Sequence, residues 1–274
     1  MPPTGQTSFS ITHRWKRRSA ARDSRGDLRL IASEKFSVDA FESGRTSNCF
    51  LAALPPDAFS LIERSLKTAA YARGTVLFNA DDEVNQVYFP HRAMISLVAV
   101  MNDGTSIETA TVGREGAAGH MAGLGQHRSF VRAVVQMPGI ISSIPALRFR
   151  AAAKESETLR NFCTRYNEVI LMQSQVTAAC NSVHSIEHRF CRWLLQSRRA
   201  VDDESVPLTQ EFMAQMLGVR RSSVSEVAGR LQKNGSISYA RGRIRILDQA
   251  KLEKCACECN ETIRKRTMLI WPLR

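Results

Sequence analysis

The chain has 274 residues, of which 43% are hydrophobic and 23% are charged, the composition of a globular protein with room for two domains. The formal net charge is +12, and the excess is unevenly placed along the chain. Residues 181–274 contain 17 basic and 10 acidic side chains, whereas residues 46–180 contain 12 and 11. A basic C-terminal third predicts a polyanionic partner for that part of the chain.

Other features exclude several classes of protein. No apolar run approaches the ~20 residues that cross a bilayer, and the N-terminal residues lack a secretory apolar block, which predicts no membrane partner and a cytoplasmic location. The seven cysteines are odd in number and lack the spacing of a secreted scaffold, which predicts free thiols. Glu108 and Glu115 lie near a glycine-rich loop without a catalytic partner, and no enzyme fingerprint is present. We therefore predict no catalytic residue and no enzyme activity.

Residues 1–45 are polar and rich in serine and arginine, with few periodic apolar positions. They are predicted to form a basic extension without stable structure. An arm that touches DNA, an idle tail and a translation start placed too far upstream all remain open as explanations.

Residues 46–152 are predicted to form one β-rich domain. "CFLAALPPDAFSLIERSL" indicates two short helices around Pro55–Pro56, and the β-rich runs "TVLF", "QVYFP", "ISLVAV" and "SIETATV" follow. Asn102–Asp103–Gly104 separates the last two runs and predicts a hairpin. With two further runs, "FVRAVVQM" and "GIISSIP", this spacing is typical of an antiparallel β-roll or small barrel.

Residues 153–181 are predicted to form a long helix, clearest from Glu157 to Cys180. A narrow, partly apolar stripe along it resembles a coiled-coil seam, which favours dimerisation, although packing on the β domain of the same chain is an alternative. The predicted dimer contacts are Phe162, Tyr166, Val169, Ile170, Gln173, Val176, Thr177 and Cys180.

Residues 182–262 show the pattern of a helix-turn-helix followed by a hairpin, with a tail at 263–274. Thr209 is an N-cap for a helix that ends at Gly218, and a second helix runs from near Arg220 to about Lys233. An α-helix fits the major groove of double-stranded DNA, and arginine-bearing hairpins reach its backbone, although helix-turn-helix shapes also bind proteins. The predicted DNA-contacting residues are Thr209, Gln210, Arg220, Arg221, Ser222, Ser223, Ser225, Glu226, Arg241 and Arg243.

Residues 48–260 resemble the Crp/Fnr superfamily of bacterial transcription regulators, most specifically at Leu208–Leu247, while "HSIEHRFCRWLLQ" resembles the first helix of its DNA-binding domain. "TQEFMAQMLGVRRSSV" and a trailing "CEC" resemble a rhizobia-like group within it. The resemblance implies an α+β fold: an N-terminal antiparallel β-roll like that of cyclic-nucleotide-binding domains, a long dimerisation helix and a C-terminal winged helix-turn-helix. It also implies a sequence-specific DNA-binding regulator that acts as a homodimer, with RNA polymerase as a further partner.

The resemblance extends to single positions of the second helix. Arg221 matches the leading base-contacting arginine of the family, and Ser223 fits its phosphate-contacting hydroxyl. Ser222 stands where a glutamate often reads cytosine, and Glu226 stands where another arginine is common. Because two of three base-reading positions differ, the usual family operator is not expected.

Cyclic-nucleotide binders of this type use a Gly-Glu pair for the ribose and an Arg-Ser pair for the phosphate. The matching stretch here has Gly119–His120 in place of Gly-Glu, and Arg128–Ser129 with Arg132 near the phosphate position. Because the carboxylate is missing, loss of cyclic-nucleotide binding is expected, and no cofactor is predicted. A regulator of the same fold that responds to a cyclic nucleotide or to thiol oxidation is the alternative.

The sequence contains a Cys-x-Cys-x-Cys run at Cys255, Cys257 and Cys259, which we expect to lie in a helix. Cys255 and Cys259 would then share a face that Cys257 does not. The run is not zinc-ribbon spacing, and both a thiol redox switch and plain structural thiols remain open. His184 and His188, four residues apart, are interpreted as solvated helix positions, and no metal is predicted.

Overall fold

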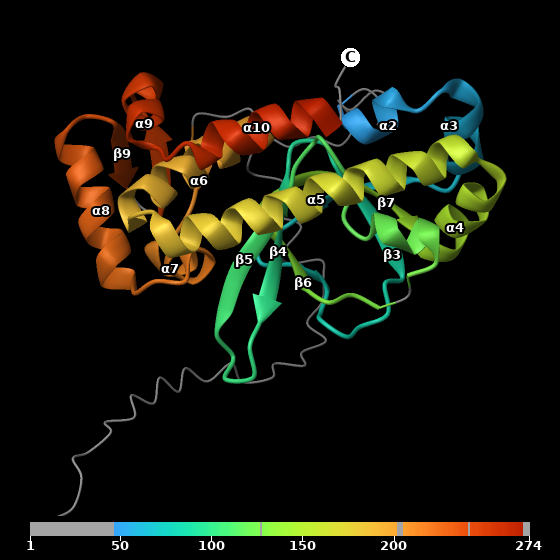
Figure 1. Cartoon of the computed structure of the whole chain (residues 1–274), viewed down its shortest axis with the longest axis horizontal. Coiled ribbons are helices and arrows are strands. Elements are labelled where there is room, and N and C mark those ends of the chain that lie inside the picture. The colour runs from blue at the N-terminus through green and yellow to red at the C-terminus, as the bar shows by residue number, and fades with distance from the viewer. Residues whose placement is uncertain (1–46, 127, 202–204, 241, 271–274) are drawn as a thin grey trace, which may run out of the picture.

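The computed structural model describes residues 47–126, 128–201, 205–240 and 242–270. The predicted extension at 1–45 and Arg241 lie outside the described residues. Figure 1 shows a β-rich N-terminal domain and a helical C-terminal domain, with the long helix α5 (Glu157–Val183) running from one to the other.

The N-terminal domain is the predicted antiparallel β-roll. After α2 (Cys49–Ala53) and α3 (Pro56–Glu63), its strands form two sheets in the orders β1-β7-β3 and β2-β6-β4-β5. The pairs within both sheets are antiparallel, and fully buried Phe89, Ile95 and Val135 belong to the core of the domain. The strands are β1 (Lys67–Tyr71), β2 (Val76–Phe78), β3 (Gln86–Pro90), β4 (Met94–Val100), β5 (Ser106–Val112), β6 (Arg132–Met137) and β7 (Gly139–Pro145).

The β4–β5 hairpin forms where the Asn-Asp-Gly signal predicted it. The backbone N–H of Met101 donates to the carbonyl oxygen of Thr105 at 2.8 Å, and Gly104 adopts a φ of 86°, which other residues rarely adopt. Two elements are not among the predictions: β1, whose sequence KTAAY has little apolar alternation, and α4 (Ala146–Glu155), which begins directly after Pro145.

Helix α5 begins at the Ser156 N-cap, whose hydroxyl accepts the Leu159 N–H at 3.2 Å. Its N-terminal half packs into the β-domain core, where Tyr166 is fully buried and meets Phe50 edge to face at 6.2 Å between ring centroids. Gly116 lies directly under this ring, since a Cβ there would be 1.7 Å from Tyr166 Cζ. Close approach of α5 to the loop after β5 therefore requires a residue without a side chain at position 116.

This packing corrects part of the predicted dimer seam. Five of the eight predicted contacts are buried within the single chain, because this stripe of α5 faces its own β domain and the C-terminal segment; they are Tyr166, Val169, Gln173, Thr177 and Cys180. Gln173, for example, accepts the backbone N–H of Thr111 at 3.2 Å. The alternative of packing on the same chain is the one observed for these residues, while Phe162, Ile170 and Val176 are half-buried.

The C-terminal domain has one core around α6 (Ile186–Val201), in which Phe190, Trp193 and Leu194 are buried. The predicted pair of helices is α7 (Gln210–Leu217) and α8 (Arg221–Lys233), and the predicted hairpin is β9 (Ile237–Ala240) with β10 (Arg243–Ile246). A third strand that the sequence did not indicate, β8 (Ser205–Pro207), pairs with the other side of β10.

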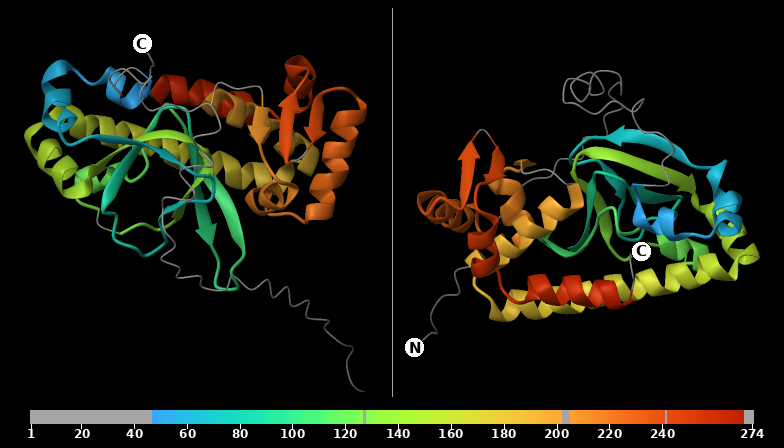
Figure 2. Two further views of the ribbon diagram at one scale, coloured as in Figure 1. Left: turned by 180° about the vertical axis from the view of Figure 1, so that it is seen from behind. Right: turned by 90° about the horizontal axis from the view of Figure 1, so that it is seen from above.

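The C-terminal segment departs from the prediction. The expected helix through the three cysteines is broken: α9 (Gln249–Cys255) ends before Cys257, and α10 (Cys259–Ile270) begins after it. The break turns Cys257 and Cys259 toward the end of α5, where both are buried. From there α10 runs back along α5, as the two views in Figure 2 show, and Ile263 joins the β-domain core.

No helix among the described residues is both long and apolar enough to span a bilayer.

Candidate nucleic-acid interface

The turn between α7 and α8 is built by local signals in the sequence. The Thr209 hydroxyl accepts the Phe212 N–H at 3.3 Å and caps α7. Gly218 ends α7 in the left-handed region at φ 63°, and its N–H donates to carbonyl oxygens of the last turn, those of Ala214 and Gln215. Buried Met213 and Leu217 on α7 and Val224 on α8 belong to one core, which fixes the angle between the two helices.

The first turn of α8 is exposed and positively charged. Arg220 and Arg221 are both exposed, and neither has an ion-pair partner in the part of the chain that the structure describes. No side chain caps this helix, and its first N–H groups therefore remain available to a phosphate oxygen. Exposed Ser222 and half-buried Ser223 flank the arginines with small hydroxyls that do not hold the helix away from a ligand.

Other predicted contacts hold the helices in place. The Ser225 hydroxyl bonds to Gln210 Oε1 at 2.6 Å and to the Arg221 carbonyl oxygen at 3.0 Å, and it thereby joins α8 to the start of α7. Glu226 is exposed but pairs with Arg230 at 2.6 Å, and Arg230 also binds Glu187 of α6 at 2.8 Å. Ser225 and Glu226 therefore have roles within the domain besides any contact with a partner.

The β9–β10 hairpin alternates exposed and buried side chains along β10. Ile244 and Ile246 enter the domain core, and Arg243 and Arg245 project to the opposite side. Gly242, at φ 73°, makes the tight turn before β10. The hairpin thus presents two arginines, with Arg241 of the prediction outside the described residues.

The helical domain docks on the β domain through buried polar groups. Trp193 Nε1 of α6 donates to Glu108 Oε1 of β5 at 3.0 Å, and Gln196 Nε2 donates to Thr111 Oγ1 at 2.6 Å. Met94 and Met137 of the β domain belong to the hydrophobic core of the helical domain. No partner for Glu108 is apparent from the sequence, because Trp193, which donates a hydrogen bond to it, lies 85 residues away in the chain.

Burial raises the pKa of the Glu108 carboxyl to about 7. Hydrogen bonds from Ser96 and Trp193 and the positive charge of Arg192 act in the opposite direction but do not cancel the cost of desolvation. The contact between the two domains is therefore built on a carboxyl group that gains its charge near neutral pH.

Four of the predicted effector residues form hydrogen bonds with other residues of the β domain. Arg128 Nη1 donates to the Asp81 carbonyl oxygen at 3.0 Å, and Arg132 Nε donates to Asn79 Oδ1 at 3.0 Å. The Ser129 hydroxyl donates to the Val131 carbonyl oxygen at 2.7 Å. A hollow of about 280 Å³ in the same domain is lined by Asp82 and Glu83 among others, and carboxylates there repel a phosphate.

His120 is buried at the start of the short helix η2 (His120–Leu124), directly after Gly119 at φ 80°. Its Nδ1 bonds to the Ala117 carbonyl oxygen at 2.8 Å, and its ring packs edge to face on Tyr166 at 5.0 Å. Burial lowers the pKa of His120 to about 4, which leaves the imidazole neutral at pH 7. The residue at the position of the missing glutamate is therefore part of the core.

Comparison with protein families matches both halves of the molecule. Residues 68–156 match the cyclic nucleotide-binding domain, and residues 188–255 match the Crp-like helix-turn-helix domain. A search of curated proteins returned no match.

Solved structures share the fold. FixK2 from Bradyrhizobium japonicum superposes with a TM-score of 0.60 at 13% identity and covers 70% of this chain and 98% of its own. A Crp/Fnr-family putative transcriptional regulator from Eubacterium rectale superposes with a TM-score of 0.59 at 19% identity and covers 74% of this chain and 95% of its own. A CRP-family regulator from Thermus thermophilus superposes with a TM-score of 0.57 at 20% identity and covers 69% of this chain and 96% of its own.

A pH series on Glu108→Gln tests the docking contact. Because the Glu108 pKa is raised in the folded state, the folded protein holds an extra proton between pH 4.5 and about 7, and Glu108 lowers the free energy of unfolding as pH rises through that window. Glutamine should remove this decrease in the free energy of unfolding. The decrease approaches roughly 3 kcal/mol above pH 7, because each pKa unit contributes ~1.4 kcal/mol. Urea titrations at pH 5 and pH 8 measure it.

The comparison between variants matters, because buried His91 and His120 have pKa values lowered to about 4 and make stability rise with pH up to their unfolded pKa. Subtracting the Glu108→Gln profile from the wild-type profile cancels that contribution. Glu63→Gln, at an exposed position of α3 away from the docking contact, is the control and should leave the profile unchanged. Parallel wild-type and Glu108→Gln profiles would contradict the assignment.

Proposed function

Because the chain belongs to the Crp/Fnr superfamily of transcriptional regulators, with a cyclic nucleotide-binding domain and a Crp-like helix-turn-helix domain, we propose that it binds a specific DNA site through α8 as a homodimer. The observation that carries the proposal is the exposed, unpaired Arg221 at the uncapped start of α8. RNA polymerase is the partner through which such a regulator acts on transcription.

Arg221 is the residue proposed to read a base. A guanidinium can donate two hydrogen bonds to O6 and N7 of guanine in the major groove, and helix N-terminal residues are the ones that reach base edges. Ser222 and Ser223 contribute short hydroxyls at the same end, and Arg220 and the free N–H groups of the first turn bind flanking phosphates. Thr209 and Gln210, at the start of α7, lie where the first helix crosses the DNA backbone.

The hairpin arginines are proposed to bind phosphates. Arg243 is exposed on a strand whose other face is buried, and it therefore approaches the DNA from outside the helix-turn-helix. Contacts of this kind add affinity that is independent of sequence and sensitive to salt. Arg221 and Arg243 should consequently differ in the kind of binding energy that they contribute.

Replacing each arginine separates the two roles. Arg221→Ala should cost about 1–3 kcal/mol on the specific site and little on random DNA, because a base contact is lost. Arg243→Ala should weaken both duplexes about equally and flatten the slope of log affinity against log salt by roughly one unit. Salt titrations by fluorescence anisotropy, on a site selected in vitro and on its scrambled version, measure both effects.

Both variants should keep the wild-type melting temperature, since neither side chain enters the core. Equal weakening of both duplexes by Arg221→Ala would show that α8 does not read bases.

The homodimer is proposed to form along the outer face of α5. Its exposed positions recur at alternating intervals of three and four residues, the spacing of a coiled-coil seam; they are Asn161, Thr164, Glu168, Leu171, Gln175, Ala178 and Ser182. Leu171, at the middle of this stripe, is 55% exposed. Half-buried Phe162, Ile170 and Val176 flank the stripe and would complete the contact.

Leu171→Lys tests this surface. Two lysines brought together at a two-fold seam repel each other and lose apolar contact, and the variant should be largely monomeric with weaker binding to a two-half-site operator. Light scattering measures the mass, and Leu147→Lys is the control because Leu147 is also exposed, on α4 away from the stripe. A monomeric wild-type protein at micromolar concentration, or a Leu171→Lys variant that remains dimeric, would refute this seam.

We also propose that the β domain no longer binds a cyclic nucleotide. The support is the use of Arg128, Ser129 and Arg132 within the domain and the buried, neutral His120 at the ribose position. The carboxylate that would accept from ribose hydroxyls is replaced by the buried imidazole of His120, and Arg128, Ser129 and Arg132 each commit one donor to a partner within the domain.

Titration calorimetry with cyclic AMP and cyclic GMP checks this proposal. No saturable heat is expected at physiological nucleotide concentrations, and the melting temperature should not change in excess nucleotide. Saturable binding with one nucleotide per chain would restore the ligand-responsive alternative.

A further inference from the structure

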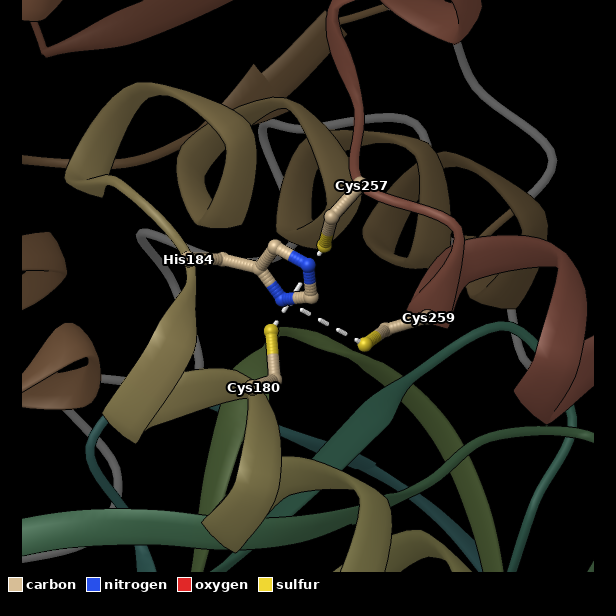
Figure 3. A group of neighbouring side chains, drawn as sticks. All are labelled: Cys180, His184, Cys257 and Cys259. Atoms are coloured by element: carbon tan, nitrogen blue, oxygen red, sulfur yellow. Dashed lines mark hydrogen bonds between the residues drawn. The ribbon is translucent and has the colours of Figure 1, made fainter.

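Four side chains from two separate segments converge where α5 ends. Cys180 lies in the last turn of α5, His184 is its C-cap residue, and Cys257 and Cys259 come from the connection between α9 and α10. Figure 3 shows the three sulfur atoms and the imidazole directed at one another. This corrects two predictions: His184 is not solvated, and Cys257 and Cys259 face the same point.

The distances match the ligand separations around a single tetrahedral ion. Cys180 Sγ lies 3.5 Å from Cys257 Sγ, Cys259 Sγ lies 3.7 Å from His184 Nδ1, and all four ligand atoms lie within 4.8 Å of one another. Bonds of ~2.3 Å to sulfur and ~2.0 Å to nitrogen at tetrahedral angles place ligand atoms about 3.5–3.8 Å apart. The two sulfurs are too far apart for a disulfide, which needs ~2.05 Å.

The histidine is oriented as metal-binding histidines are. Its Nε2 bonds to Glu258 Oε2 at 3.1 Å, which places the ring proton on that nitrogen and leaves the lone pair of Nδ1 facing the cysteines. Glu258 lies between Cys257 and Cys259 in the chain, and one short segment therefore supplies two ligands and the group that orients a third.

Two buried arginines interact electrostatically with the cysteines of this cluster. Arg189 and Arg192 are buried at 8% and 4% exposure, and the Nε atom of each has no hydrogen-bond partner among the described residues. Three thiolates and one divalent cation leave a charge of −1 on the cluster, which a neighbouring guanidinium offsets.

We propose that Cys180, His184, Cys257 and Cys259 bind one Zn²⁺ ion. Thiolate and imidazole ligands in a closed tetrahedral set are the donors of structural zinc sites. An iron–sulfur cluster would need ligands spread over several iron atoms, and this cage surrounds a single point.

The ion would fasten the junction between the two domains. Cys180 and His184 end α5, α6 begins two residues later at Ile186, and Cys257 follows α9 of the helical domain. Coordination would therefore hold α9 and α10 against α5 and restrict rotation of the helical domain about residue 185. Any effect on DNA binding rests on the proposed function, whereas binding of the metal does not.

Metal analysis of the full-length protein, purified anaerobically without added metal, tests the site. About one zinc per chain is expected, and Co²⁺ should replace it with the intense visible bands of a tetrahedral, thiolate-rich site. Cys257→Ser and His184→Ala should lose the metal and these bands. Cys255→Ser is the matched control, because Cys255 lies in the same segment but outside the cluster, and it should keep both.

Glu258→Gln should lower Zn²⁺ affinity by roughly 10–100-fold, measured by competition with a chromophoric chelator, while the protein still binds Zn²⁺ when saturated. Wild-type protein that binds neither Zn²⁺ nor Co²⁺ with its thiols reduced would overturn the proposal. Iron with acid-labile sulfide in place of zinc, or a Cys180–Cys257 disulfide whose reduction restores no metal affinity, would also overturn it. These measurements use no DNA, and their outcome is therefore independent of the tests of α8.

Discussion

The position of each candidate site depends on the contact of α5 with the β domain. Tyr166 can reach the core only because Gly116 leaves room for its ring, and the aromatic rings of Phe50 and His120 then enclose it. Burial of this scale contributes of the order of 25 cal/mol for each Å² of apolar surface removed from water. With one face of α5 held in this way, the opposite face is available to a second copy and the end of the helix is fixed in space.

The second domain is held by a different kind of contact. Around Trp193 and Glu108 the interface is polar and buried, with an aliphatic part supplied by Met94 and Met137. Polar contacts of this kind are directional, and their stability depends on the protonation of Glu108. A regulator needs a domain arrangement that is defined but can be altered, and a small polar interface beside a large apolar core has that property.

Local features of the fold were predictable because their signals lie within a few residues. Thr209, Gly218 and the Asn-Asp-Gly turn act on their own neighbours, and the elements they delimit appear where expected. The face that α5 buries was not predictable, since its stripe suits a partner helix as well as a sheet.

Sites built from distant segments were also hidden in the sequence. Cys180 and Cys257 are 77 residues apart, and the break between α9 and α10 that brings them together has no strong turn signal. In one continuous helix, Cys257 would face away from the side that Cys255 and Cys259 share. The resemblance of α8 to known regulators was informative because its predicted contact residues are all close together in the chain, whereas Glu108 and Trp193 come from different domains.

In α8 the residues that maintain the fold are different from the exposed residues of its first turn, and this has a consequence for how the protein's sequence can diverge. Its buried positions Val224, Val227 and Leu231 maintain the fold, and Ser225 and Arg230 bind neighbouring helices. The side chains of Arg221 and Ser222 are exposed and lie outside the core formed by the described residues. Mutations at the two exposed positions are therefore close to neutral for stability. With base reading by α8 as proposed, copies of this protein that arise by gene duplication can acquire separate sets of target genes through a few substitutions in one helical turn, without passing through an unfolded intermediate.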